Sequence, residues 1–72
     1  MKASILTIGD EILNGTTIDT NSAYIAKQSV ANGIAIAGIY SISDSYNGIY
    51  EGLEIAGKNA DIIFITGGLG PT

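Results

Sequence analysis

Three short apolar runs, separated by two stretches long enough to form helices, restrict this chain to very few folds. The runs cover residues 3–8, 34–40 and 61–65, and each is rich in isoleucine and mostly apolar on both faces of a strand. This pattern is typical of parallel strands that are covered on both sides. The stretches between the runs have the length that a parallel crossover requires. The sequence therefore predicts an α/β protein of the order β-α-β-α-β.

Capping residues and apolar spacing indicate where the first helix lies. The Asp-Thr-Asn of 19–21 supplies N-cap residue types, and Asn32-Gly33 is a stop signal. Ala23, Ala26 and Val30 fall at i, i+3 and i+7. We therefore expect these three side chains to form the buried face of the helix.

The second helix is indicated by apolar residues at i, i+4, i+7 and i+8, which are Ile49, Leu53, Ala56 and Gly57. Either residue of Asp44-Ser45 is suited to cap it. Glycines within this stretch each cost about 1 kcal/mol relative to alanine, so the helix depends on tertiary packing.

Right-handed crossovers then limit the topology. We expect the strand order 2-1-3 in a Rossmann-like parallel sheet, with helices on both faces. In such open sheets, ligands bind outside the carboxyl ends of the strands, where the strand order reverses. The sequence places Gly9-Asp10-Glu11 after the first strand, Asp44 after the second, and residues 66–72 after the third. All the residues that could take part in catalysis or ligand binding thus fall on one edge of the sheet.

The glycine-rich segment at 66–72 has two interpretations. Gly67, Gly68 and Gly70 let a ligand approach the main chain, and Pro71 suits the first turn of a helix, whose free N–H groups bind phosphate. The alternative is a tight strand-to-helix turn with no ligand. The segment matches neither the Walker A motif nor Gly-x-Gly-x-x-Gly.

The acidic residues also allow two interpretations each. Asp10-Glu11 either holds Mg²⁺ or another hard cation, or caps a turn of helix over 11–13. Asp44 is either a helix cap or a ligand contact. Asp19 and Asn21 are expected to be caps.

Composition excludes several classes of function. The chain has no cysteine and no histidine, so disulfides and the common zinc sites are absent. Its net charge is −4, with three lysines and no arginine, so it lacks the basic surface of a nucleic-acid binder. No apolar run is long enough for a membrane span or a signal peptide, and we expect a cytoplasmic protein. With only 72 residues, we expect a homo-oligomer.

Taken together, four segments resemble one known family. They are Gly9-Asp10-Glu11-Ile12-Leu13-Asn14-Gly15, Asp19-Thr20-Asn21, Asp44, and Thr66-Gly67-Gly68-Leu69-Gly70-Pro71-Thr72. Their order and separation resemble the N-terminal domain of the CinA (competence/damage-inducible) family, in the MoaB/Mog-type molybdopterin-binding superfamily. The likeness covers the whole chain, but only about the first half of such a domain.

The resemblance implies that residues 1–72 are the N-terminal part of a larger three-layer α/β/α domain. It implies metal-dependent hydrolysis of the pyrophosphate in ADP-ribose or a related dinucleotide. One alternative is a non-catalytic module that binds molybdopterin, and another is a scaffold or oligomerisation element. The expected partner is therefore a nucleotide or a pterin phosphate.

The resemblance also implies roles for particular residues. Asp44 and Glu11 are expected to be catalytic, and Asp44 to bind a divalent metal (Mg²⁺, Mn²⁺ or Co²⁺). The expected ligand-binding residues are Gly9, Asp10, Thr66, Gly67, Gly68, Gly70 and Thr72. The family's last motif continues to an aspartate beyond residue 72, where we expect a further metal ligand. We therefore expect the fragment to be inactive alone.

Overall fold

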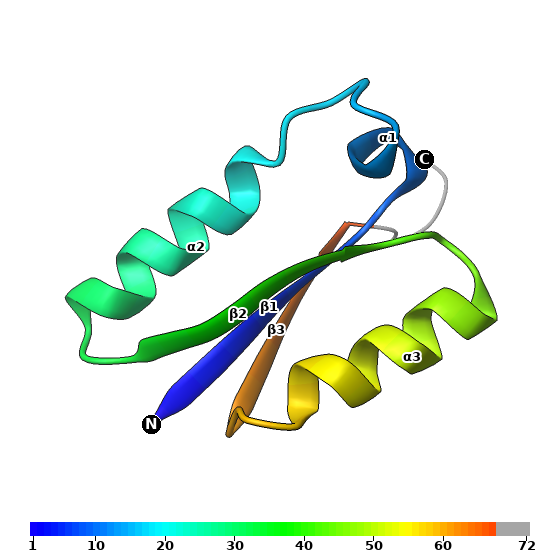
Figure 1. Cartoon of the computed structure of the whole chain (residues 1–72). Helices are drawn as coiled ribbons and strands as arrows, with labels where there is room; N and C mark the ends of the chain where they lie inside the picture. Colours follow the sequence, from blue (N-terminus) through cyan, green and yellow to red (C-terminus); the bar gives the residue numbers. More distant parts are fainter. Residues whose placement is uncertain (68–72) are drawn as a thin grey trace.

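A computed structural model describes residues 1–67, which form a three-stranded parallel sheet (Figure 1). Strand β1 (Lys2–Ile8) lies in the middle, between β2 (Ala35–Ile42) and β3 (Ile62–Gly67). The observed order β2-β1-β3 confirms the prediction from the sequence. The boundaries differ slightly, because β2 extends to Ile42 and β3 to Gly67.

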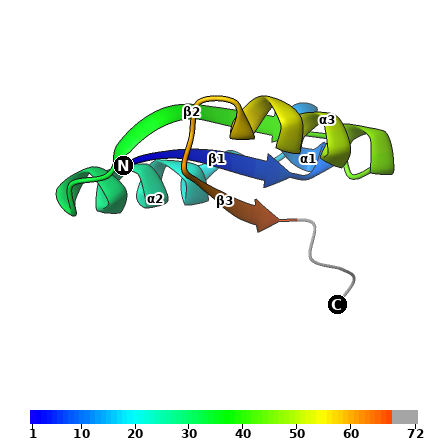
Figure 2. The same ribbon diagram turned by 90° about the horizontal axis from the view of Figure 1, so that it is seen from below.

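Helices cover both faces of the sheet, as expected. They are α1 (Asp10–Leu13), α2 (Thr20–Ala31) and α3 (Tyr46–Gly57). Figure 2 shows α2 and α3 on opposite sides of the strands, which is the arrangement that right-handed crossovers produce. The short α1 confirms the turn of helix expected over 11–13. None of the helices in the described part of the chain combines the length and apolar character needed to cross a membrane.

Burial is concentrated in the central strand. Every residue from Ala3 to Gly9 is buried, whereas residues of β2 and β3 are half-buried or exposed. The prediction that all three strands are covered on both sides is therefore correct for β1 only. Ile39 of β2 and Ile65 of β3 remain 49% and 47% exposed, because each lies on an outer strand of the sheet.

The side chains of β1 alternate between the two helical layers. Leu6 lies against α3, where it is near Gly52, and Thr7 lies against α2, where its hydroxyl contacts Ser22. Most of the core is formed by four fully or nearly fully buried residues of this strand, which are Ala3, Ile5, Leu6 and Ile8.

The buried face of α2 differs from the one expected. Val30 is 62% exposed and Ala23 is also exposed, whereas Ser22 and Ser29 are buried. The face that contacts the sheet is therefore displaced by one position toward the N-terminus. Small serine side chains let the helix lie close to the strands, and a search for apolar periodicity does not count them.

The packing of α3 is only partly as expected. Ala56 is buried and Ile49 half-buried, but Gly52 provides the closest contact with the sheet and Leu53 is 36% exposed. Ser45 is the N-cap, and its side chain accepts a hydrogen bond from the Gly48 N–H at 3.0 Å. Gly33, with φ of 83°, follows the C-cap of α2 as expected.

Candidate functional site

A pocket lies at the carboxyl ends of β1 and β3, where the strand order reverses. Its volume is about 160 Å³. The two strands contribute Thr7, Ile8, Thr66 and Gly67, α1 contributes Glu11 and Ile12, and the segment 17–21 forms the remaining wall. A pocket therefore lies at the expected topological switch point.

Two threonines face this pocket from neighbouring strands. Thr7 and Thr66 are paired in the register of β1 and β3, so their side chains lie on the same face of the sheet. Thr17 and Thr20 add further hydroxyl groups from the facing wall. The lining therefore contains several hydroxyl groups, and those other than Thr7, which donates to Asp19, can donate hydrogen bonds to oxygen atoms of a ligand.

Gly67 ends β3 in a conformation that other residues rarely adopt. Its φ is 81°, and a Cβ atom placed there would collide with the carbonyl oxygen of Ile8. Glycine is thus required for the close approach of the two strand ends. This approach forms the floor of the pocket between β1 and β3.

Glu11 brings a carboxylate to the same pocket. Its Oε1 and Oε2 atoms lie over Gly9, at 2.9 Å from where a Cβ atom of residue 9 would be. Gly9 also continues the sheet, because its N–H donates to the Ile42 carbonyl oxygen at 3.0 Å. Of the expected site residues, Glu11, Thr66 and Gly67 are brought together here, with Gly9 beneath the Glu11 side chain.

Asp44 lies on the other side of β1, beside Asp10. The Asp44 N–H donates to Asp10 Oδ1 at 3.4 Å, and both side chains are exposed. Asp44 lines a separate hollow of about 220 Å³ together with Ser45, Tyr46 and Ile49. The expected residues thus share one edge of the sheet but form two groups. Gly68, Gly70, Pro71 and Thr72 lie outside the described residues.

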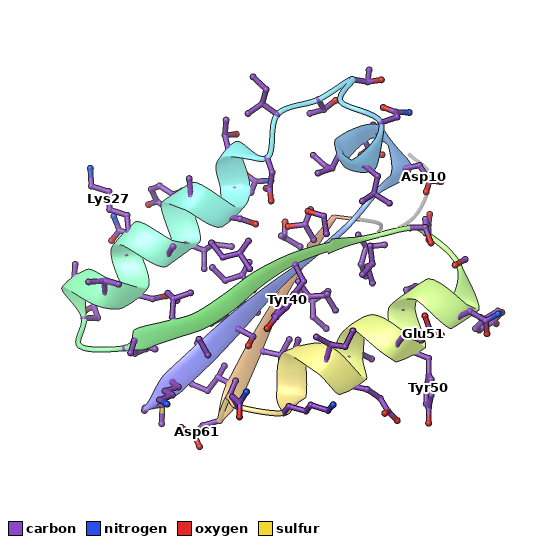
Figure 3. All side chains as sticks on the ribbon, in the orientation of Figure 1. Asp10, Lys27, Tyr40, Tyr50, Glu51 and Asp61 are labelled. Carbon is purple, nitrogen blue, oxygen red and sulfur yellow. The ribbon has the colours of Figure 1, made fainter. Side chains whose placement is uncertain are left out.

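The pocket contains carboxylates but no cationic side chain. Glu11 and Asp19 both line it, whereas none of the three lysines of the chain does. Lys27 extends from the outer side of α2, away from the edge that carries Asp10 (Figure 3). Lys2 begins β1 and Lys58 follows α3, at the opposite edge of the sheet. An anionic ligand in this pocket therefore depends on a metal ion or on backbone N–H groups.

The carboxylates at this edge of the sheet offer oxygen atoms, which are the type of ligand that a hard divalent cation prefers. Mg²⁺ and Mn²⁺ prefer oxygen ligands, and Mg²⁺ often binds through one or two carboxylates together with phosphate oxygens of a substrate. Asp10 and Asp44, which are joined by the contact from the Asp44 N–H to Asp10 Oδ1, supply carboxylates of this kind. Within residues 1–67 no group of three acidic side chains is arranged to hold a metal ion.

Thr7 and Asp19, which line the pocket, form a hydrogen-bonded cluster with Ser22. Thr7 Oγ1 donates to Asp19 Oδ2 at 2.9 Å, and the Ser22 N–H donates to Asp19 Oδ1 at 3.0 Å. The Thr7 and Ser22 hydroxyl oxygens are 2.7 Å apart. Because the single proton of Thr7 is given to Asp19, Ser22 must be the donor in this last bond.

Asp19 is the N-cap of α2, as the sequence predicted. Partial burial raises the pKa of its carboxyl group, but hydrogen bonds from Ser22 and Thr7 outweigh that effect and bring the pKa below its ordinary value. Thr7 and Ser22 were not identified from the sequence. The available signals were a hydroxyl residue within an apolar strand and a serine three residues after an N-cap aspartate.

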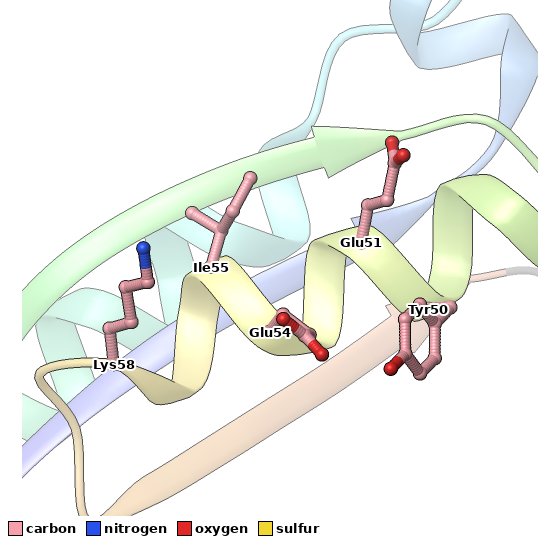
Figure 4. A pocket seen from close by; sticks show the side chains of 5 residues that line it. All are labelled: Tyr50, Glu51, Glu54, Ile55 and Lys58. Atoms are coloured by element: carbon pink, nitrogen blue, oxygen red, sulfur yellow. The ribbon is translucent and has the colours of Figure 1, made fainter.

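A third hollow lies along α3 (Figure 4). It is lined by Tyr50, Glu51, Glu54, Ile55 and Lys58 and contains none of the expected site residues. The switch-point pocket is therefore the candidate functional site.

Comparison with known proteins shows which family the chain resembles. A sequence-family model described as "Probable molybdopterin binding domain" matches residues 4–72. CinA-like proteins of Flavobacterium psychrophilum and Fusobacterium nucleatum are each 49% identical to this chain over its full length. The chain spans only 17% and 18% of the length of these two relatives.

The fold is also similar to a solved structure. A crystal structure of the protein CinA, of unknown function, from Thermoplasma acidophilum matches 99% of this chain with a TM-score of 0.93 and 34% identity. The match covers 42% of that protein.

Proposed function

Since this chain belongs to the "Probable molybdopterin binding domain" family, we propose that its switch-point pocket binds the phosphate part of a nucleotide or pterin ligand together with a divalent metal ion. The observation that carries this proposal is the lining of the pocket. It combines two carboxylates with several threonine hydroxyls and has no lysine. A phosphate group beside these carboxylates would be repelled unless a cation lay between them.

The residues divide into two roles. Thr66 and the main chain at Gly67 bind phosphate oxygens through hydrogen bonds, in the part of the pocket between the strand ends. Asp44 and Asp10, which lie at the same sheet edge but outside the lining of this pocket, would hold the metal ion, which would supply neutralisation of phosphate charge and a lower pKa of bound water. Glu11 lies within the pocket and accepts a proton from the attacking water.

In the intact protein we propose hydrolysis of the pyrophosphate in ADP-ribose or a related dinucleotide, and ADP-ribose is the substrate considered below. The oxygen of water forms a bond to one phosphorus, and the bond from that phosphorus to the bridging oxygen breaks. The products are AMP and ribose 5-phosphate. The assignment rests on what the resemblance to the CinA family implies, and this chain is similar to CinA-like proteins over its full length.

The test is to incubate the intact protein with ADP-ribose and Mg²⁺, Mn²⁺ or Co²⁺ and to measure AMP. We expect AMP with at least one metal and none after chelation. Glu11→Gln should lower kcat by about 10²-fold or more, as loss of a general base does. Glu51→Gln on the outer side of α3 is the matched control and should not change kcat. Absence of AMP with every metal would overturn hydrolysis.

A second candidate is supported by the description of the matching family. The pocket would then bind molybdopterin without catalysis. Its phosphate would use the same threonine-rich wall. Molybdopterin affinity, combined with no turnover of ADP-ribose, would favour this function over hydrolysis.

A further inference from the structure

We propose that Thr7, Asp19 and Ser22 form a positioning cluster that holds one wall of the ligand pocket at a fixed place relative to the strand ends. The inference rests on the proposed function, since it concerns the same pocket. It assigns a role to residues that need not touch the ligand's reacting atoms.

The first argument is where the cluster is buried. Thr7 and Ser22 are only 4% and 2% exposed, at the contact between α2 and β1. Apolar residues of similar shape could fill this interface with nearly equal or greater stability. Hydrogen-bonded side chains are more directional than apolar contacts, so they specify one placement of the helix on the strand. No buried side-chain polar atom among residues 1–67 lacks a partner, so the cluster is fully satisfied.

The second argument is what the cluster connects. Asp19 begins α2 and belongs to the segment 17–21, which forms one wall of the pocket. Thr7 belongs to β1 and pairs in register with Thr66, on the opposite side of the pocket. The bond from Thr7 Oγ1 to Asp19 Oδ2 at 2.9 Å therefore joins the wall directly to the strand that carries the floor.

The third argument is that the wall has few other attachments to the sheet. Its first residue is tied to α1, because the Thr17 N–H donates to the Glu11 carbonyl oxygen at 3.0 Å. The side chain of Ile18, the second residue of the segment, is 82% exposed. Removing the Thr7 hydroxyl should therefore let the wall move relative to Thr66.

The test compares binding of ADP-ribose with Mg²⁺ by calorimetry in variants of the intact protein. Thr7→Val keeps the shape of the side chain but removes the hydroxyl, and should raise Kd about tenfold or more, as a displaced binding group does. Ser22→Ala should also raise Kd. Thr7→Ser restores the hydroxyl and should return Kd close to that of the unmodified protein.

Ser29→Ala is the matched control. Ser29 is a second buried serine on the same face of α2, two turns after Ser22 and outside the cluster. If the cluster were only structural, Thr7→Val and Ser29→Ala would both lower stability and leave Kd unchanged, and the proposal would be overturned. Failure of Thr7→Ser to restore binding would also overturn it.

The outcome is separable from that of the proposed hydrolysis. Binding without AMP release would reject hydrolysis, while the order of Kd values would still decide the role of the cluster. If the unmodified protein neither binds nor cleaves ADP-ribose and does not bind molybdopterin, both proposals fail.

Discussion

At Gly67 the missing side chain is what allows two strand ends to meet. The residue combines a left-handed φ of 81° with close proximity to the Ile8 carbonyl oxygen. Gly15 has nearly the same φ, 82°, but nothing lies within 4 Å of the position of its absent Cβ atom. Comparing the two glycines therefore separates the free-energy cost of placing a side chain in this backbone conformation from the cost of its collision with Ile8.

Substituting both residues measures these two costs. Gly15→Ala should lower the free energy of unfolding by about 1–2 kcal/mol, the penalty for a left-handed L-residue. Gly67→Ala should lower it by distinctly more, because the new methyl group also meets the Ile8 carbonyl. Urea denaturation of the two variants gives the comparison. Equal losses would show that the strand ends are not in close contact.

Asp19 makes stability depend on pH in a defined direction. Its folded pKa is lower than in the unfolded chain, so the folded state favours the carboxylate. The stabilisation is fully present above the unfolded pKa of about 3.9 and is lost as pH falls through the folded pKa. The unfolding free energy of the unmodified protein should therefore exceed that of Asp19→Asn most clearly above about pH 5. A difference that stays constant down to pH 2 would contradict this account.

At the scale of elements, α3 lies close to the sheet because of a glycine in its buried face. A Cβ atom at Gly52 would lie 2.9 Å from two carbons of Ile42 and 3.1 Å from Leu6 Cδ1. At Gly57, on the last turn, the nearest atom would be Ile63 Cδ1 at an ordinary 3.6 Å. The same helix thus contains a crowded glycine and an open one.

Alanine substitutions at these two positions should change stability in opposite directions. Gly57→Ala should raise the unfolding free energy by up to about 1 kcal/mol, through better helix propensity. Gly52→Ala gains the same propensity but forces Ile42 and Leu6 to move in the core, so it should lower the unfolding free energy by about 1–3 kcal/mol. Thermal unfolding of both variants tests the contrast. A stabilising Gly52→Ala would mean that the core accommodates the methyl group.

Element identity and order were predictable because they depend on local pattern. Apolar runs give the strands, cap residues such as Asp19 and Ser45 start the helices, and crossover handedness gives β2-β1-β3. The buried face of α2 was not predictable from apolar spacing, because Ser22 and Ser29 are polar residues that the fold nevertheless buries.

The sequence predicted which edge of the sheet carries the candidate site, but not which residues share a pocket there. Strand ends place Glu11, Asp44 and Thr66 at the same edge of the sheet, and the structure agrees. Which of them share a cavity depends on side-chain direction and on the path of the loop to α2. These tertiary details separate Asp44 from the pocket that contains Glu11 and Thr66.

At the scale of the whole molecule, only β1 is fully enclosed. The outer strands β2 and β3 leave Ile39 and Ile65 about half exposed, and each outer strand has one edge without a neighbouring strand among residues 1–67. Unpaired strand edges with apolar side chains are sites where another chain can pair. We therefore expect the isolated chain to self-associate through its sheet, which is the physical basis of the predicted homo-oligomer.

Placing a charge on an outer strand should weaken this association. Ile65→Lys and Ile39→Lys each introduce an ammonium group that must lose water when strands pair, so sedimentation velocity should show smaller species at equal concentration. Val30→Lys makes the same change of charge on the exposed side of α2, where Val30 is 62% exposed, and should leave the distribution unchanged. Far-UV circular dichroism must first show that all three variants keep their helices. A monomeric unmodified chain that melts cooperatively would contradict association, and an equal effect of Val30→Lys would place the contact away from the sheet edges.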